Sequence, residues 1–288
     1  MKSVIITGAN RGIGFDAAIA FARAGYKVFA TMRNPEKAEA LKKKVKEESL
    51  NVTLYAMDVD SDESVKLSME AMQKANGPVD VLVNNAGIER HGSIEELTIK
   101  DFKAVMDTNY FGVLRCIQAV LPLMRRERKG CIINIASVSG RISTSPLGAY
   151  SASKFALEAI SEALAMEVKP FNIRVAIVEP GIINTDMARN IGHSGNSIYP
   201  QVNRFGGLFV ASLKTPTPST LVADKILEIA ESGTWILRHP VGPDAKPFLD
   251  WRASMTDEEW IDRNAASDEE WYSATERDFG LDAREIKK

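Results

Sequence analysis

The chain has 288 residues, of which 45% are hydrophobic and 26% charged, with a formal net charge of −2. This length allows one large α/β domain or two smaller ones. Because the net charge is near zero, no overall electric field attracts nucleic acid or an anionic membrane, and we expect neither as a partner. The apolar run Val4–Ile6 is too short for a signal-peptide core, and no stretch reaches the roughly 20 apolar residues of a membrane helix. We therefore expect a cytoplasmic protein.

Short apolar, β-branched runs alternate with helical patterns along the chain. Several runs are apolar on consecutive residues, which is typical of parallel strands covered on both faces. The predicted strands are Val4–Ile6, Val28–Ala30, Val52–Ala56, Val79–Val83, Cys131–Ile135, Val175–Val178 and Trp235–Leu237. The predicted helices are Gly12–Ala24, Pro35–Glu48, Asp62–Ala75, Ile99–Arg128, Ala149–Lys169 and Ser219–Ser232. This alternation predicts an α/β fold with a doubly wound, Rossmann-like, seven-stranded parallel sheet and helices on both faces.

Two segments interrupt the alternation. The connection at about 182–218 is long and contains the apolar patch Phe205–Leu213, so we predict a lid over a binding site. The tail 251–288 carries eleven acidic and six basic residues and three of the four tryptophans. Thr256 to Glu259 and Ser267 to Glu270 each fit a capping box. We predict a single domain over 1–250 and a docked, acidic helical appendage over 251–288.

The first predicted strand runs directly into a glycine-rich turn and an Ala-rich helix. Gly8, Gly12 and Gly14 stand in Thr7-Gly8-Ala9-Asn10-Arg11-Gly12-Ile13-Gly14. Glycines permit a tight turn and close backbone approach, and the following helix N-terminus directs free N–H groups at an anion. Alone, three glycines could equally form a structural turn without a ligand.

Further polar or glycine-containing segments follow the other predicted strands. They are Asp58-Val59 after the third strand, Asn84-Asn85-Ala86-Gly87 after the fourth, Ser137 after the fifth, and Pro180-Gly181 with Ile183 and Thr185 after the sixth. Ligands bind at the carboxyl ends of the strands in open α/β sheets. These segments and the glycine turn therefore predict one shared binding edge.

A tyrosine and a lysine open the helix that follows the fifth strand. Tyr150 and Lys154 are four residues apart, so the phenol and the ammonium share one helix face. A nearby cation favours the phenolate, and we expect Lys154 to lower the pKa of Tyr150. The hydroxyl of Ser137 can hydrogen-bond a developing alkoxide. Asn109 lies within the long predicted helix before the fifth strand.

In their order along the chain, these segments resemble the short-chain dehydrogenase/reductase family. The shared features are T-G-x-x-x-G-x-G at Gly8, Gly12 and Gly14, N-N-A-G at Asn84–Gly87, the set Asn109, Ser137, Tyr150 and Lys154, and the Pro180-Gly181 turn. The resemblance implies an oxidoreductase in which Tyr150 is the acid and base, Ser137 fixes the substrate oxygen, Lys154 holds the nicotinamide ribose and Asn109 anchors a proton path. It also implies that Gly8, Asn10, Arg11, Gly12, Ile13, Gly14, Asp58, Val59, Asn85, Ala86, Gly87, Tyr150, Lys154, Pro180, Gly181, Ile183 and Thr185 bind the cofactor.

The residues after the second strand bear on the choice of cofactor. NAD specificity normally needs an acidic residue there, to accept hydrogen bonds from the ribose. This chain reads Ala30-Thr31-Met32-Arg33-Asn34, without a carboxylate. Arg33 and Arg11 can both reach a 2′-phosphate, and a guanidinium suits phosphate geometry. We predict NADP(H), although two solvated surface arginines are the plainer interpretation of these residues in isolation.

For the substrate we predict a lipophilic carbonyl or alcohol compound beneath the lid. Ile88–Gly92 and Val138–Leu147 are expected to meet it, with Glu89, Arg90, His91 and Arg141 as polar options. The three histidines are scattered without metal-site spacing, so we expect no metal. The family resemblance implies a homodimer or homotetramer formed through the fourth and fifth predicted helices. The alternative is an NADPH-binding regulator or sensor without turnover.

Overall fold

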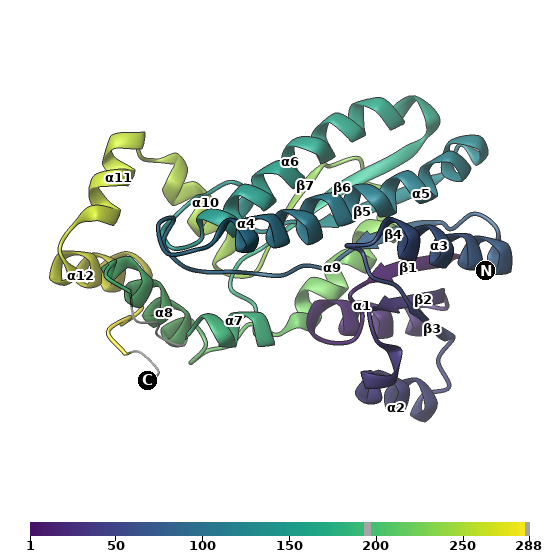
Figure 1. The fold of residues 1–288 in the computed structure, drawn as a ribbon, viewed down its shortest axis with the longest axis horizontal. Coiled ribbons are helices and arrows are strands. Elements are labelled where there is room, and N and C mark those ends of the chain that lie inside the picture. Colours follow the sequence, from purple (N-terminus) through teal and green to yellow (C-terminus); the bar gives the residue numbers. More distant parts are fainter. Residues whose placement is uncertain (193–196, 286–288) are drawn as a thin grey trace.

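The structure is a computed structural model and describes residues 1–192 and 197–285. A parallel sheet runs through its centre in the order β3-β2-β1-β4-β5-β6-β7 (Figure 1). The strands are β1 (Ser3–Thr7), β2 (Lys27–Met32), β3 (Val52–Ala56), β4 (Val81–Asn84), β5 (Gly130–Ile135), β6 (Ile173–Pro180) and β7 (Arg238–Val241). The predicted doubly wound α/β fold with seven parallel strands is confirmed. The order reverses between β1 and β4, which places a binding crevice at their carboxyl ends.

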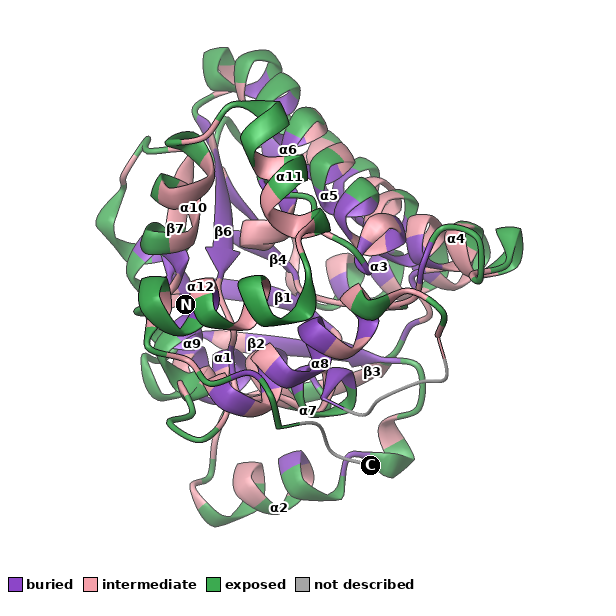
Figure 2. Ribbon diagram, turned by 90° about the vertical axis from the view of Figure 1, so that its left-hand side faces the viewer, coloured by how far each residue is buried: buried purple, intermediate pink, exposed green. Residues whose placement is uncertain are grey.

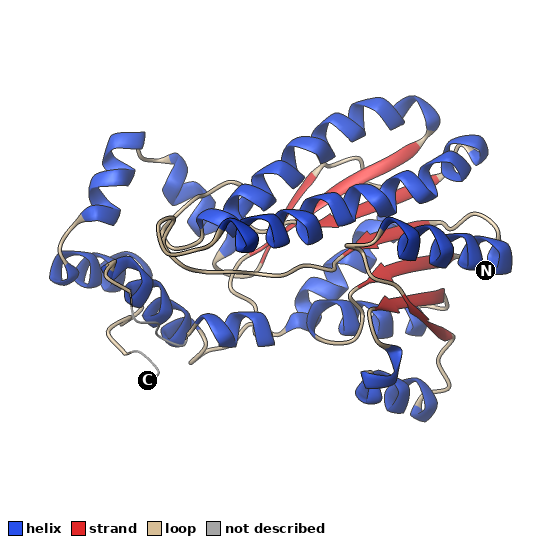
Figure 3. Ribbon diagram, viewed as in Figure 1, coloured by secondary structure: helices blue, strands red, loops and turns tan. Residues whose placement is uncertain are grey.

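Helices cover both faces of the sheet (Figure 3). One face carries α1 (Gly12–Arg23), α2 (Glu39–Glu47) and α9 (Ser219–Ser232), and the other carries α3 (Asp62–Asn76), α5 (Gly112–Glu127) and α6 (Gly148–Val168). Alternate residues of β1 belong to the two cores: Val4 and Ile6 face α1, while Ile5 faces α3 and α5. Successive side chains of a strand point to opposite faces, which explains why the central strands are apolar at every position.

The seventh strand lies elsewhere than predicted. Trp235–Leu237 directly precedes the strand, with only the Leu237 carbonyl accepting from Ile177 of β6, and β7 is the more polar segment Arg238–Val241. Trp235 and Ile236 are exposed. Among the described residues β7 is an edge strand that pairs with β6, and Pro240, which has no N–H to donate, is tolerated there. The strand predicted from the apolar run Trp235–Leu237 is therefore wrong, because an edge strand does not need to be apolar.

The long helix predicted over Ile99–Arg128 is interrupted. It consists of α4 (Ile99–Met106), a π-helical turn at Asp107–Phe111 and α5. Such turns occur mostly as single insertions within α-helices and often at functional sites. The turn contains Asn109, so the insertion decides where that side chain points.

The predicted lid is partly helical, with α7 (Asp186–Ile191) and α8 (Pro200–Ser212), while its residues 193–196 lie outside the described part. Helix α10 (Ala245–Ala253) spans the predicted boundary between 250 and 251. The tail then forms α11 (Asp257–Ala265) and α12 (Asp268–Phe279), and the structure confirms both capping boxes. These helices gather beyond the carboxyl ends of the strands, with largely exposed outer faces (Figure 2). None of the described helices has the length and apolar character needed to cross a membrane.

Candidate active site

A cavity of about 390 Å³ opens at the carboxyl edge of the sheet. All the predicted site residues line it except Gly14 and Asn109; the lining includes Gly8, Asn10, Arg11, Gly12, Ile13, Arg33, Asp58, Val59, Asn85, Ala86, Gly87, Ser137, Tyr150, Lys154, Pro180, Gly181, Ile183 and Thr185. The fold thus brings strand ends from across the whole chain to one place. Each group comes from the first residues after a strand or from the helix that follows.

The glycine turn has the shape of an anion cradle. Gly8 and Gly12 have positive φ angles of +65° and +55°, and a Cβ on Gly8 would come within 2.9 Å of the Ala86 Cα. A Cβ on Gly14 would overlap Asn85, whose side-chain amide donates to the Thr7 carbonyl at 2.9 Å. The residue before α1, Arg11, makes no side-chain cap, so the first N–H groups of the helix stay available. These residues fit the pyrophosphate of a dinucleotide.

Arg11, Arg33 and three aspartates also line this cavity. Arg11 is 70% exposed and forms a 3.5 Å ion pair with Asp186, while Arg33 is also exposed. Burial raises the pKa of Asp60, and the nearby Arg33 guanidinium opposes that rise. Asp58 accepts from the backbone N–H of Asp60 at 3.2 Å. Both guanidinium groups belong to exposed residues of the cavity lining, and a phosphate could compete with Asp186 for Arg11.

Tyr150, Lys154 and Ser137 come together in the lining of the same cavity. Tyr150 and Lys154 lie one turn apart on α6, with the ammonium 5.6 Å from the centre of the phenol ring. Lys154 is buried and donates a 2.8 Å hydrogen bond to the Ile135 carbonyl. Ser137 caps the short turn after β5 and accepts from the Ser139 N–H at 3.1 Å. A phenol, a hydroxyl and an ammonium thus surround one small volume.

The protonation of this site differs from the sequence-based expectation. Burial raises the pKa of Tyr150 above its usual value of 10, a hydrogen bond with Ser137 lowers it, and Glu89 raises it further. Burial also lowers the pKa of Lys154 to about 8, against the opposing charge of Glu158. The predicted lowering of the Tyr150 pKa is therefore not what the structure shows. The phenol keeps its proton at neutral pH.

Asn109 stands behind the cavity and does not line it. The side chain is fully buried. Its amide donates to the Ile88 carbonyl at 2.9 Å and to the Ser153 hydroxyl at 3.0 Å, and its oxygen accepts from the Ile88 N–H at 2.8 Å. The π turn thereby fastens the chain after β4 to α6, next to Lys154.

The wall opposite the strand ends is apolar, and part of it was missed from the sequence. Phe205 and Phe209 of the predicted lid pack with Leu147, Ile191 and Tyr150. The tail also lines the cavity, through Phe248, Trp251, Trp260, Trp271, Thr275 and Phe279. The three tryptophans of the tail were the available signal in the sequence. They predicted that the tail packs on the domain, but not that it packs at the cavity.

The predicted polar options on the substrate side separate in the structure. Glu89 lines the cavity, whereas His91, Arg90 and Arg141 are not among its lining residues. His91 lies 3.2 Å from the Glu89 carboxylate, and Arg141 pairs at 3.3 Å with the buried Glu179. Of the four polar side chains predicted on the substrate side, only Glu89 therefore faces the cavity, and His91 and Arg141 are paired with carboxylates.

Comparison with known proteins gives the family. The short chain dehydrogenase family model matches residues 2–195. A 3-ketodihydrosphingosine reductase from Bacteroides thetaiotaomicron is 39% identical over 211 residues, 73% of this chain and 74% of its own length. Human retinol dehydrogenase 8 is 42% identical over 189 residues, 65% of this chain and 60% of its own length.

Among solved structures, a short-chain dehydrogenase from Streptomyces avermitilis superposes with a TM-score of 0.76 at 33% identity, covering 92% of this chain and 98% of that one. The family match covers the glycine turn and the ends of strands β1 to β6 that line the cavity, and the structural match extends over most of the chain. The chain is therefore a member of the short-chain dehydrogenase family and an oxidoreductase enzyme that uses a nicotinamide dinucleotide on a small-molecule substrate.

Proposed function

We propose that this enzyme is an NADP(H)-dependent alcohol dehydrogenase or carbonyl reductase. It interconverts a secondary alcohol and a ketone, or a primary alcohol and an aldehyde, on a lipophilic substrate. The observation that carries this proposal is the meeting of Tyr150, Ser137 and Lys154 in a cavity whose remaining wall is aromatic and aliphatic. The names of the two relatives, a keto-compound reductase and a retinol dehydrogenase, support the same type of reaction.

The residues divide the work as follows. Tyr150 gives its proton to the carbonyl oxygen in reduction and takes the hydroxyl proton in oxidation. The Ser137 hydroxyl holds the substrate oxygen and stabilises its developing charge. Lys154 binds the nicotinamide ribose and stays anchored at the Ile135 carbonyl. When bound, the dinucleotide supplies or accepts the hydride, and the protein orients the substrate carbon toward it.

The cofactor preference is part of the proposal. The glycine turn would hold the pyrophosphate, and Arg33 and Arg11 would pair with the 2′-phosphate that distinguishes NADP(H) from NAD(H). The end of β2 and the two residues after it, Ala30–Asn34, contain no acidic residue that could bind a free ribose hydroxyl.

The test is to measure initial rates with NADPH and NADH over a panel of lipophilic ketones and aldehydes, for the wild type and Arg33→Asp. We expect NADPH to be the better donor, and kcat/KM for NADPH to fall about 100-fold in Arg33→Asp, since a charge-assisted bidentate contact is replaced by repulsion. Equal kcat/KM values for NADPH and NADH in the wild type, or an unchanged ratio of these values in Arg33→Asp, would mean that Arg33 does not bind the 2′-phosphate.

A further inference from the structure

The last described residues of the chain lie directly against the lid helix α8. A Cβ added to Gly207 would overlap the backbone carbonyl oxygen of Ala283, and Ala283 is fully buried. At the neighbouring Gly206, the nearest atom to an added Cβ is the Ile191 carbonyl oxygen, 3.5 Å away, which is an ordinary contact. The absence of a side chain at position 207 is therefore what lets the tail approach this helix.

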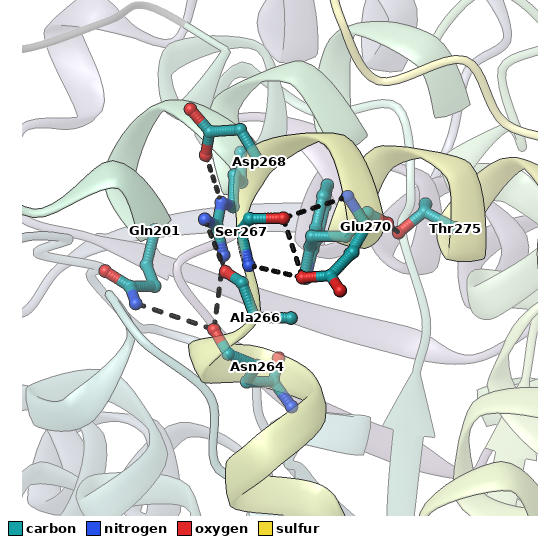
Figure 4. Close-up of polar contacts among 9 residues, drawn as sticks. Gln201, Asn264, Ala266, Ser267, Asp268, Glu270 and Thr275 are labelled. Carbon is teal, nitrogen blue, oxygen red and sulfur yellow. Dashed lines mark hydrogen bonds and ion pairs between the residues drawn. The ribbon is translucent and has the colours of Figure 1, made fainter.

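A buried arginine fastens the same helix to the junction between α11 and α12. Arg204 is only 3% exposed. Its guanidinium donates to the Asp268 carboxylate at 2.6 Å, the Ala266 carbonyl at 2.8 Å and the Asn264 carbonyl at 3.3 Å. Figure 4 labels these three acceptor residues at the junction between α11 and α12. It also lies 5.9 Å from the centre of the Trp271 ring. A planar, fully charged donor with this many acceptors fixes its partners in position.

The tail that is held in this way presents aromatic rings to the cavity. Trp251 meets Trp260 and Phe279 edge to face, with ring centres 4.8 Å and 4.9 Å apart. All three residues line the cavity, opposite Tyr150 and the strand ends. The indole N–H of Trp260 donates to the Ser143 carbonyl at 3.1 Å, which ties this wall to the loop before α6.

We propose that α8 and the helices α10–α12 form one capping unit that selects the substrate. The unit is fastened at Gly207 and Arg204, and its aromatic wall takes the apolar body of a bulky carbonyl or alcohol compound while the reacting carbon stays at Tyr150. Small carbonyl compounds, which are too short to touch the wall, do not depend on it. Arg204 is a positioning residue in this scheme, and Trp251, Trp260 and Phe279 determine specificity. This inference rests on the proposed oxidoreductase function of the same cavity.

The test compares two ketones that share one reacting group, cyclohexanone and 4-phenylcyclohexanone, in the wild type, Gly207→Ala and Gly206→Ala. We expect the wild type to prefer the phenyl compound. In Gly207→Ala, kcat/KM for the phenyl compound should fall about tenfold or more, because a buried phenyl group loses its apolar contacts. The cyclohexanone rate should change little, and Gly206→Ala should behave as the wild type with both ketones. Arg204→Lys, which keeps the charge but loses the planar fork, should repeat the selective loss.

Binding of 4-phenylcyclohexanol to the full-length protein saturated with NADP⁺, measured by calorimetry, provides a readout that needs no turnover. Loss of this binding in Gly207→Ala alone supports the capping unit even if neither ketone is reduced, in which case the proposed reaction fails separately. Equal rates for the two ketones in the wild type, or equal losses in both glycine variants, would overturn the capping unit and leave the proposed reaction standing. Thermal melting of each variant shows whether it has kept its fold.

Discussion

Lys154 lies between two groups of different kind on α6. Tyr150 is one turn before it and Glu158 one turn after it, and both Lys154 and Glu158 are buried. Glu158 accepts from Arg238 at 2.9 Å, and its neighbour Glu179 accepts from Arg141 at 3.3 Å. Each carboxylate keeps one buried oxygen without a hydrogen-bond partner among the described residues. Lys154 therefore has a buried carboxyl group one turn away, and that group lies near a second buried carboxyl group.

Glu158 gives the molecule a predicted dependence of stability on pH. Burial and then the charge of Glu179 raise its pKa from 4.5 to about 7, so the folded state keeps a proton that the unfolded state has lost. The stabilisation is complete below pH 4.5 and is lost as the pH rises through about 7. Relative to the wild type, Glu158→Gln should therefore gain a few degrees in Tm between pH 5 and pH 8.

Glu162→Gln is the matched control for this prediction. Glu162 also pairs with Arg238, at 2.6 Å, but it is half exposed and Arg238 lowers its pKa. Its carboxylate stays ionised between pH 5 and pH 8, so the difference from the wild type should be flat over this window. The measurement is Tm at several pH values between 5 and 8. If the Tm difference between Glu158→Gln and the wild type does not change with pH, the pKa of Glu158 is not raised in the folded protein.

Among the elements, the π turn at Asp107–Phe111 connects the cofactor side of the cavity to α6. Its Asn109 makes three hydrogen bonds within the interior, two to Ile88 and one to Ser153. Asn109→Ala should lower the free energy of unfolding by about 2–3 kcal/mol, because the Ile88 backbone groups lose their partners in a buried setting. It should also lower kcat, since Ser153 neighbours Lys154.

Denaturant unfolding checks the stability part of this prediction, with Lys46→Ala on the exposed surface of α2 as the control. The control should stay within about 0.5 kcal/mol of the wild type, as is usual for surface substitutions. A similar small change in Asn109→Ala would mean that water replaces the amide without loss, and that the turn is held by other contacts.

The central strands could be predicted because burial on both faces makes each of their residues apolar, as in Val4, Ile5 and Ile6. At the sheet edge this signal fails, and the apolar segment Trp235–Leu237 lies beside the true strand β7. Helices α11 and α12 could be predicted from their capping boxes, which act locally, whereas α10 has no side-chain cap and was not predicted. Where those helices dock depends on Gly207 and Arg204 in a distant helix, and no local pattern carries that information.

The same distinction holds for the site. The glycine turn, Ser137, Tyr150 and Lys154 could be placed together because parallel strands end at one edge. The aromatic wall could not, since it is formed by helices from outside the sheet. The direction of the pKa shift of Tyr150 could not be predicted from the sequence either, because it depends on how deeply the phenol is buried.

For the whole molecule, we propose a homo-oligomer formed through the outer faces of α5 and α6. Phe155 and Met166 are 43% and 66% exposed, and their spacing along α6 puts them on one face. Phe111, in the adjoining π turn, is 48% exposed. We expect a dimer or tetramer in light scattering, and Phe155→Glu should shift the mass toward the monomer. A wild type that is monomeric at all concentrations would contradict this.

The central claim is that Tyr150 is the proton donor and acceptor of a carbonyl–alcohol reaction. Its most direct test is turnover of the best ketone with NADPH by wild type and Tyr150→Phe, together with NADPH binding to both proteins. We predict that the variant binds NADPH as the wild type does, while kcat falls by at least about 100-fold, which is the usual contribution of general acid catalysis. Undiminished turnover in Tyr150→Phe, or tight NADPH binding by both proteins without turnover of any carbonyl compound, would contradict it.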